Sequence, residues 1–473
     1  MMRSLYSGVS GLKNHQTRMD VVGNNISNVN TTGFKSSRVT FSDTLSQTLS
    51  GASAPTENRG GTNPKQIGLG SATSAIDTLF TDGSVQSTGV NTDLCLSGNG
   101  LFIVKDGNLS YYTRNGNFKF DKEGYYVNSD GLKVQGWSAT TPGDAINTNG
   151  QPSEICIPAG KTMAAAATKV ATFSKNLDAA EPMIASITVT KADGTTDDTQ
   201  TKAEVGKNDV VSITLKMTDG TTTTETSGAF EKGKSKPKTT IATIYDSLGN
   251  AHNVTIYMTK TKVDSKNGNQ WTISLNPAGG GTQEIKESDG STTQVQMTDA
   301  VLEFDVNGGL TKGSGSATLT LTNGAGTGQT VNLTFDDVTQ YAGSSTAFAT
   351  TDGNAAGTLK SVSIDSNGVI TGTYTNGLNV QEAQVAIAQF NNASGLTKTG
   401  NSLYTESNNS GTPNIGTISD LGCTVTPSSL EMSNVDMASE LTDMIVTQRG
   451  YQSNSKIITV SDELLETLIN MKR

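Results

Sequence analysis

Apolar side chains near the start of the chain recur at alternating spacings of four and three residues. The members of this seam are Leu5, Val9, Leu12, Met19 and Ile26, with Gln16 and Gly23 at the positions that are not apolar. Such spacing is typical of a helix that packs against another helix. The pattern predicts a helical segment over residues 1–30, because a run of asparagines then lowers helix propensity and Gly33 ends the segment.

The end of the chain repeats this pattern over a longer stretch. The apolar seam positions there are Met437, Leu441, Met444, Tyr451, Ile458, Leu465 and Ile469. Polar residues at positions 448, 455 and 462 weaken the seam, and Gly450 loosens its middle. Ser433 and Asp436 together resemble a capping box before the helix. A second helical segment is therefore predicted over residues 432–473.

Neither predicted helix is stable alone, because a helix of this length draws most of its stability from packing. A narrow apolar seam fits a second helix better than a broad core. The partner is either the other terminus of the same chain, in a helical hairpin that caps a β domain, or a terminus of a neighbouring chain. The two seams predict helix pairing and leave both partners open.

Between the two ends the pattern changes to short strand-like runs. Asn-Gly and Asp-Gly dipeptides, such as Asn115-Gly116 and Asp130-Gly131, punctuate these runs and accept the positive φ that tight hairpin turns need. Turn signals at regular spacing are typical of β-sandwich or barrel-like domains. The predicted fold class is mainly β, with nested β-sandwich or barrel-like domains and α-helical, coiled-coil-forming N- and C-termini.

Shifts in composition divide the chain further. Residues 31–75 contain a stretch rich in Ser, Thr, Gly and Asn without clear periodicity, which predicts an extended connector. Residues 76–138 and 360–431 are predicted to form one β domain, and residues 139–359 to form one or two outer β domains. Within the outer region, residues 183–238 are rich in Thr and Lys and are a possible extra inserted domain.

Composition and charge narrow the function. Only 16% of the 473 residues are charged, and the net charge of −10 repels a nucleic-acid backbone. No apolar stretch is long enough for a signal peptide or a transmembrane helix, which predicts no membrane insertion. Cys95, Cys156 and Cys423 are too few and too widely spaced for a disulfide framework or a zinc site. We expect Cys95 and Cys156 to be small core residues.

Candidate chemistry is sparse. A nucleophile with a histidine base would have to use His15 or His252, and neither lies in a catalytic motif. We expect His252 to be structural and His15 to be a surface or assembly contact. Glycine pairs lack the other residues of a phosphate loop, and the turn at 365–368 lacks the later ligands of a calcium loop. The sequence predicts no enzyme, no catalytic residue, no cofactor and no metal site.

Long motifs stand at both ends of the chain. They are LYSGVSGL at 5–12, NNISNVNTTGFK at 24–35, EMSNVD at 431–436 and MIVTQRGYQ at 444–452. These motifs strongly resemble the flagellar rod and hook protein family. Their family-motif residues include Asn24, Asn25, Asn28, Gly33, Ser433, Asn434, Gln448 and Arg449. Internal segments at 61–68, 245–252 and 364–368 resemble the hook members, whereas 183–238 departs from the shorter ones.

The resemblance implies a non-enzymatic structural subunit of the bacterial flagellar hook. Such a subunit self-assembles into a curved, flexible tube that transmits torque from the rod to the filament, with the terminal helices as an inner coiled-coil layer. The implied partners are further copies of the chain, the distal rod protein, the hook cap protein, the hook–filament junction protein and the flagellar type III export apparatus. The implied location is extracellular, after export without a cleaved signal peptide. The alternatives are a rod or hook–filament junction protein and a secreted glycan-binding adhesin.

Overall fold

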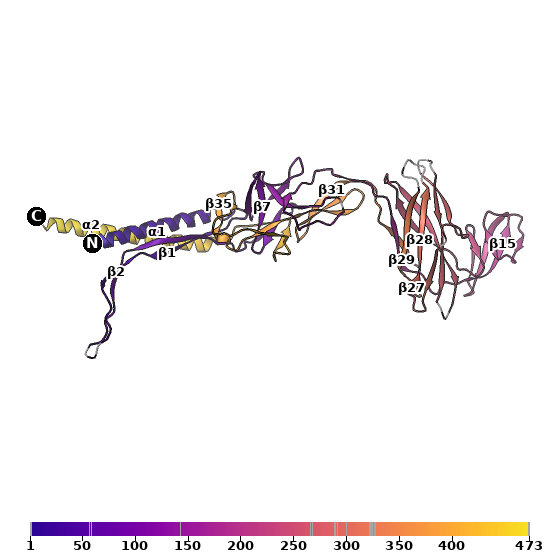
Figure 1. Cartoon of the computed structure of the whole chain (residues 1–473), viewed down its shortest axis with the longest axis horizontal. Coiled ribbons are helices and arrows are strands. Elements are labelled where there is room, and N and C mark those ends of the chain that lie inside the picture. The colour runs from indigo at the N-terminus through magenta and orange to yellow at the C-terminus, as the bar shows by residue number, and fades with distance from the viewer. Residues whose placement is uncertain are drawn as a thin grey trace. The chain divides into compact units, whose positions relative to one another are not determined.

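The chain divides into two compact units in the computed structural model. The first comprises residues up to Lys161 together with those from Leu359 onward, and the second is Thr162–Thr358. The structure describes residues 2–471, except positions 56, 58, 142, 265, 267, 288, 289, 291, 299, 321–324, 326 and 327. Helix α1 (Met2–Ser27) and helix α2 (Met437–Asn470) stand near the chain ends, and most other elements are strands (Figure 1). The predicted fold class is confirmed; positions 1, 472 and 473 of the predicted helical segments lie outside the described residues.

Helix α2 begins with an N-cap that differs from the predicted one. Asp436 is the N-cap, and its carboxylate accepts a hydrogen bond from the backbone N–H of Ala438. The hydroxyl of Ser433 accepts instead from the N–H of Val435, before the helix begins. The predicted capping box is therefore wrong, because the helix starts one full turn later than that motif requires.

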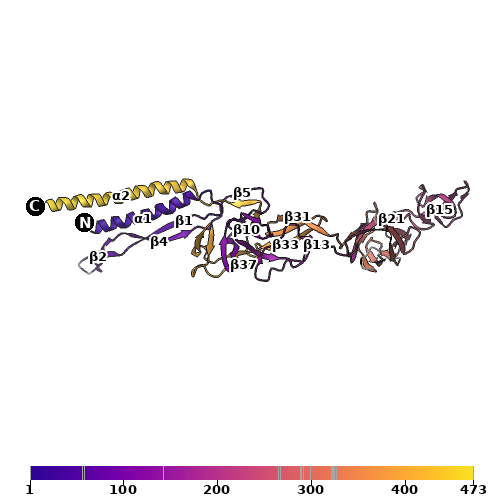
Figure 2. The same ribbon diagram turned by 90° about the horizontal axis from the view of Figure 1, so that it is seen from above.

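The segment after α1 folds back on itself as a long β-hairpin. Its strands are β1 (Ser37–Asp43), β2 (Ser46–Ser50), β3 (Lys65–Gly68) and β4 (Ser71–Thr78). β1 pairs with β4 and β2 with β3, both antiparallel. The Asn14 amide of α1 donates to the Ser71 hydroxyl at 2.7 Å, so the base of the hairpin is bound to the helix. β1 and β4 contact α1, and Figure 2 shows both strands beside that helix.

The β domain of the first unit is built on a large antiparallel sheet. Its central order is β31-β32-β33-β11-β7-β8-β36-β35. These strands are β7 (Gly100–Asp106), β8 (Leu109–Thr113), β11 (Lys133–Ser138), β31 (Gly357–Ile364), β32 (Val369–Tyr374), β33 (Asn379–Val385), β35 (Thr397–Gly400) and β36 (Leu403–Thr405). Aromatic and aliphatic side chains, among them Phe102, Phe118 and Val385, fill its main core.

Shorter elements complete this unit. They are β5 (Val85–Ser87), β6 (Leu94–Ser97), β9 (Phe118–Phe120), β10 (Tyr126–Asn128), β12 (Ser153–Glu154), β34 (Ile387–Gln389), β37 (Asn414–Gly416), β38 (Thr424–Pro427), β39 (Ser429–Glu431) and the 3-10 turn Ala393–Gly395. β39 pairs with β5 and leads directly into α2. The last strand of the chain thus ties α2 to the β domain.

The second unit is a sandwich of two sheets. One has the order β21-β22-β23-β26-β27 and the other β24-β25-β28-β29-β14-β30. Their bounds are β14 (Val170–Asn176), β21 (Lys238–Tyr245), β22 (Ala251–Lys262), β23 (Gln270–Ser274), β24 (Thr282–Lys286), β25 (Thr292–Met297), β26 (Ala300–Phe304), β27 (Leu310–Lys312), β28 (Ser314–Thr320), β29 (Gln329–Thr339) and β30 (Phe348–Thr351), preceded by β13 (Thr162–Met163). Phe173, Ile256, Trp271 and Leu333 meet in their shared core.

An inserted module, residues 184–231, interrupts this sandwich between β14 and β21. Its strands are β15 (Ile184–Lys191), β16 (Thr196–Asp197), β17 (Lys202–Glu204), β18 (Val210–Met217), β19 (Thr222–Glu225) and β20 (Ala229–Glu231). Ile187, Val189, Ile213 and Leu215 alternate with polar residues along β15 and β18 and form a separate small core. The domain boundaries proposed from composition stay predictions.

Candidate assembly site at the chain termini

The two terminal helices of the first unit run antiparallel, and their contacts fix the pairing. The Arg18 guanidinium lies 2.9 Å from the Asp443 carboxylate. The Asn25 amide donates to Glu440 at 2.9 Å. The end of α1 therefore meets the beginning of α2, and both chain ends lie at the same end of the pair (Figure 1).

Glycines let the helices approach each other closely. A Cβ atom on Gly11 would lie 2.7 Å from the amide nitrogen of Asn454, and one on Gly450 would lie 2.6 Å from the ring of His15. Distances this short do not occur between a real Cβ and its neighbours, so the side chains of Asn454 and His15 occupy the space that the glycines leave. Gly450, which the sequence pattern marks as a weak point of the helix, is a packing position.

The contact between the helices is mostly polar. Burial raises the pKa of Glu440, while its hydrogen bond from Asn25 opposes this shift. His15 Nδ1 and Thr447 Oγ1 are buried and have no hydrogen-bond partner among the described residues. Buried polar atoms without partners reduce stability, so the helix pair is only modestly stabilised by its own contacts.

The predicted apolar seams take only a partial share in this contact, in which Ile458 packs against Gly8. Leu5, Leu12, Met19, Ile26, Met444, Ile458 and Leu465 are partly buried. Val9, Met437, Leu441, Tyr451 and Ile469 are exposed. The buried positions of α1 are instead Gly8, Asn14, Val22 and Asn25, and those of α2 are Thr447 and Ser461. A row of mostly small and polar residues at spacings of three and four (8, 11, 15, 18, 22 and 25, of which only Val22 is apolar) is the signal that could have located this face.

Where the helix pair meets the β domain, a buried ionic junction joins both terminal segments of the chain to that domain. Lys35 and Glu431 have side chains no more than 1% exposed, and Lys35 Nζ lies 2.6 Å from Glu431 Oε1. Lys35 also donates to the Thr81 carbonyl at 2.5 Å, and Glu431 accepts from the Gly83 N–H at 2.8 Å. Desolvation lowers the pKa of Lys35, and the Glu431 carboxylate opposes that shift.

Arg114 extends this junction into the sheet. Its guanidinium lies 2.7 Å from the Asp82 carboxylate and 3.7 Å from Glu431. It also donates to the carbonyls of Leu96 and Gly98, at 2.6 and 2.5 Å. Arg114 Nε and Glu431 Oε2 are buried without a hydrogen-bond partner among the described residues and face each other at 3.7 Å. The junction brings together charged and backbone groups from three regions of the chain, and the removal of one of these charges leaves another buried without its partner.

Several residues of the resemblance motifs meet beside this junction. Asn25 exchanges two hydrogen bonds with the backbone of Ser37, at 2.9 and 3.0 Å. Asn434 accepts from the N–H of Ser36 at 2.8 Å and donates to the Leu79 carbonyl at 2.9 Å. These two side chains therefore bind adjacent backbone groups where the α1-to-β1 connection enters β1.

The other motif residues have more local contacts. Asn28 donates to the Asn24 carbonyl at 2.9 Å, which closes the last turn of α1. Gly33 has a φ of +67°, and a Cβ there would lie 2.6 Å from the Asn115 nitrogen. Gln448 and Arg449 are exposed on α2.

The remaining candidate residues lie outside this site. His252 is fully buried, with Nδ1 2.7 Å from Glu287 and Nε2 3.3 Å from Asp246. Cys95 and Cys423 are buried, and Cys156 is partly buried. Among the described residues, no cluster of three or more His, Cys, Asp or Glu side chains is arranged to hold a metal ion. No helix in that part of the chain is both long and apolar enough to cross a membrane.

Family models match successive parts of the chain. The model of the flagella basal body rod protein matches residues 5–35, and that of the flagellar hook protein FlgE/F/G D1 domain matches 95–174. The flagellar basal body protein FlaE D2 domain matches 214–354. The flagellar basal body rod FlgEFG protein C-terminal model matches 426–471.

Whole proteins match over the full length. The flagellar hook protein FlgE of Borreliella burgdorferi is 39% identical, with 100% of both chains covered. That of Salmonella typhimurium is 31% identical, covering 99% of this chain and 100% of the relative. A crystal structure of Helicobacter pylori flagellar hook protein FlgE2 aligns with a TM-score of 0.49 and 16% identity, covering 73% of this chain and 100% of that one.

Proposed function

The chain belongs to the flagellar hook protein FlgE family and is a structural subunit of the flagellar hook, and from this premise we propose that its copies assemble through the paired terminal helices. The pair presents two different faces. One is the close, polar contact between α1 and α2, which holds the pair together within a chain. The other is the apolar surface that this contact leaves exposed.

The exposed apolar surface of the helix pair carries the proposal. Its large apolar side chains are Tyr6, Val9, Met437, Leu441, Ile445, Val446, Tyr451, Ile457, Val460, Leu464, Leu468 and Ile469, each at least 40% exposed. Apolar side chains gathered on one element mark an interaction surface. Complete burial of a fully exposed side chain of this kind contributes about 1.5–3 kcal/mol, and these side chains are about half exposed, so each has roughly half of that still to contribute. Repeated along the pair, such contacts favour polymerisation.

The same proposal accounts for the predicted seams. Five seam residues are exposed and the others are only partly buried, so their apolar surface remains available to neighbouring copies. We propose an inner layer of terminal helices in a curved, flexible tube, with the β domains outside it. In this arrangement the chain transmits torque from the rod to the filament and has no enzymatic role.

The proposed partners follow from membership of the family. They are further copies of the chain, the distal rod protein, the hook cap protein, the hook–filament junction protein and the type III export apparatus. We propose an extracellular position, reached without a cleaved signal peptide. The full-length matches to hook proteins support a hook subunit over a rod or junction protein, and none of the contacts described above favours a glycan-binding adhesin.

A test compares charged substitutions at two exposed positions of α2 in the full-length chain. Leu464→Asp places a charge on the apolar surface, whereas Thr459→Asp places the same charge at an exposed polar position outside the predicted seam. We expect electron microscopy to show tubes with the Thr459 variant and none with the Leu464 variant. Tubes formed equally well by both variants would reject the helix pair as the assembly surface.

A further inference from the structure

The inserted module has its own core and two connections to the sandwich, so independent motion is the default expectation. The contacts at the joint oppose such motion. We propose that the inserted module and the sandwich form one rigid body, locked at their joint by Lys260. The lock is a property of the second unit and does not depend on the proposed function.

The entering connection, residues 177–183, leads from β14 into the module, and the leaving connection, residues 232–237, leads from the module to β21. Hydrogen bonds hold the two connections together as a ribbon. The N–H of Ile184 donates to the Lys234 carbonyl at 2.8 Å, and the N–H of Gly233 donates to the Ile184 carbonyl at 2.9 Å. The ribbon is bound in turn to β22, because the N–H of Ser235 donates to the Lys260 carbonyl and the N–H of Lys260 donates to the Ser235 hydroxyl, both at 2.9 Å. Rotation of the module would break these hydrogen bonds together.

The Lys260 side chain of β22 binds the backbone of the entering connection. It is 3% exposed, and its Nζ donates to the carbonyls of Ala179 at 2.6 Å and Glu181 at 3.3 Å. Desolvation lowers the pKa of Lys260, and the carboxylates of Asp178 and Glu181 oppose that shift. A buried ammonium without its acceptors is costly. Displacement of the entering connection therefore carries an electrostatic penalty in addition to the lost hydrogen bonds.

An ion pair joins the entering connection to the start of β21. Lys238 Nζ lies 2.9 Å from the Glu181 carboxylate, whose side chain is 10% exposed. Glu181 thus contributes a backbone carbonyl to Lys260 and a carboxylate to Lys238. Glu181 of the entering connection is therefore bound by two lysines of the sandwich, Lys238 in β21 and Lys260 in β22.

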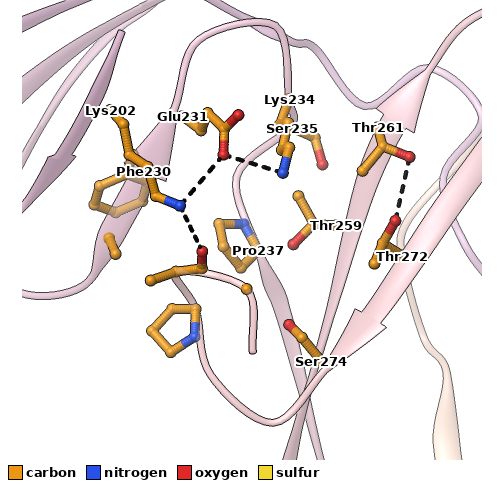
Figure 3. A pocket seen from close by; sticks show the side chains of 14 residues that line it. Lys202, Phe230, Glu231, Lys234, Ser235, Pro237, Thr259, Thr261, Thr272 and Ser274 are labelled. Carbon is orange, nitrogen blue, oxygen red and sulfur yellow. Dashed lines mark hydrogen bonds and ion pairs between the residues drawn. The ribbon is translucent and has the colours of Figure 1, made fainter. Parts of the chain in front are cut away.

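The opposite side of the joint is closed by a second lysine cluster (Figure 3). Lys202 of the module lies 3.7 Å from Glu231 and donates to the Ala278 carbonyl of the sandwich at 3.1 Å. Lys234 lies 3.1 Å from Glu231, and both lysines point toward that carboxylate. The lining of the cleft at this point comes from both the module and the sandwich. The hydrogen bond from Lys202 to the Ala278 carbonyl therefore adds a direct contact between them.

Spin-label distance measurements on the full-length chain test the lock. Lys216→Cys places a label on the exposed face of β18 in the module, and Ile241→Cys places one on the exposed face of β21 in the sandwich. Cys156→Ser removes the partly exposed native thiol from every variant. We expect a single narrow distance distribution. Lys260→Met, which keeps the apolar stem and removes the ammonium, is expected to broaden it about twofold.

The matched control is Lys232→Met, which removes an exposed ammonium from the leaving connection. We expect it to leave the distribution narrow. Should Lys260→Met unfold the sandwich, detected by Trp271 fluorescence, Lys238→Met replaces it and is expected to broaden the distribution to a smaller extent. A broad distribution in the parent chain overturns the proposal. So does a distribution that stays equally narrow in the lysine variant used and in the control.

Discussion

Lys35 and Glu431 lie 396 positions apart and form a buried ion pair in which the Nζ and Oε1 atoms are 2.6 Å apart. Lys35 follows the connection after α1, and Glu431 ends β39, the strand that leads into α2. The pair therefore joins both terminal helices to one point of the β domain. The junction is thus one of the contacts through which a load on either helix reaches the β domain.

The first prediction concerns the free energy of unfolding of the first unit. Lys35→Met or Glu431→Gln leaves one buried partner uncompensated and is expected to cost about 3–5 kcal/mol. The double variant is expected to cost less than the sum of the two, because it leaves no uncompensated charge on either residue. Urea unfolding monitored by Trp137 in a Trp271→Phe background measures this unit alone.

Two controls belong to that experiment. Trp271 in a Trp137→Phe background reports the second unit, which the substitutions should leave unchanged. Arg38→Met removes a far more exposed pair with Asp77, at 3.9 Å, and should have little effect. Additive costs in the double variant would show that the two charges do not interact in the folded chain.

The second prediction contrasts two glycines of the terminal helices. A side chain on Gly450 meets the ring of His15, whereas one on Gly23 meets nothing within 4 Å. Gly450→Leu should force α1 and α2 apart and speed hydrogen exchange in both helices. Gly23→Ala should slow exchange in α1, since alanine stabilises a helix interior by about 1 kcal/mol relative to glycine. Slower exchange in both variants would mean that the helices do not pack through Gly450.

The apolar seams predicted both terminal helices, because periodicity is a local property of the sequence. They did not predict how the helices contact each other. That contact uses Gly11, His15 and Gly450, and the close approach of a glycine to a ring cannot be recognised from spacing alone. Seam residues such as Leu441 are apolar yet exposed, so contacts within one chain do not explain why these positions are apolar.

Two further features could not be predicted from the sequence, for different reasons. The hairpin of β2 and β3 is exposed on both faces, so its residues lack the alternation that predicts a strand. The Lys35–Glu431 pair depends on tertiary structure, since nothing in the sequence around either residue indicates which residue it will pair with. In β15 and β18, by contrast, Ile187 and Ile213 stand in alternating patterns from which strands can be predicted.

The third prediction concerns alkaline pH. Burial is the largest of the causes that raise the pKa of Tyr112, Tyr126, Tyr374 and Tyr404 above the ordinary value of 10.0. The unfolded chain loses these protons near pH 10, while the folded first unit retains them. The unfolded state then binds fewer protons, so stability is full below pH 10 and falls as the pH rises further.

Tyrosinate absorbance during an alkaline titration measures this effect. We expect these four residues to remain protonated in the folded chain just above pH 10 and to ionise there in urea. Substitution of Tyr374 by Phe should make the folded and urea curves more alike. Identical curves in the two conditions would show that the four hydroxyls are open to solvent.

The fourth prediction concerns the reactivity of the cysteines. Thiolate is the form that reacts with alkylating reagents, and burial raises the pKa of Cys95 to about 11 and also raises that of Cys156. The access of the reagent to each thiol then decides the order in which the cysteines react, because Cys95 and Cys423 are buried and Cys156 is partly exposed. Mass spectrometry after alkylation of the folded chain should find Cys156 modified first.

Cys95 lies in β6, close enough to the junction for the charges of Glu431 and Arg114 to affect its pKa, so it reports on the junction as well. Glu431→Gln should speed alkylation of Cys95 because the weakened junction opens more often, whereas Cys156 should react at its original rate. Cys156→Ser gives the same comparison without the competing thiol. Rapid modification of Cys95 in the parent chain would mean that β6 opens without disruption of the Lys35–Glu431 pair.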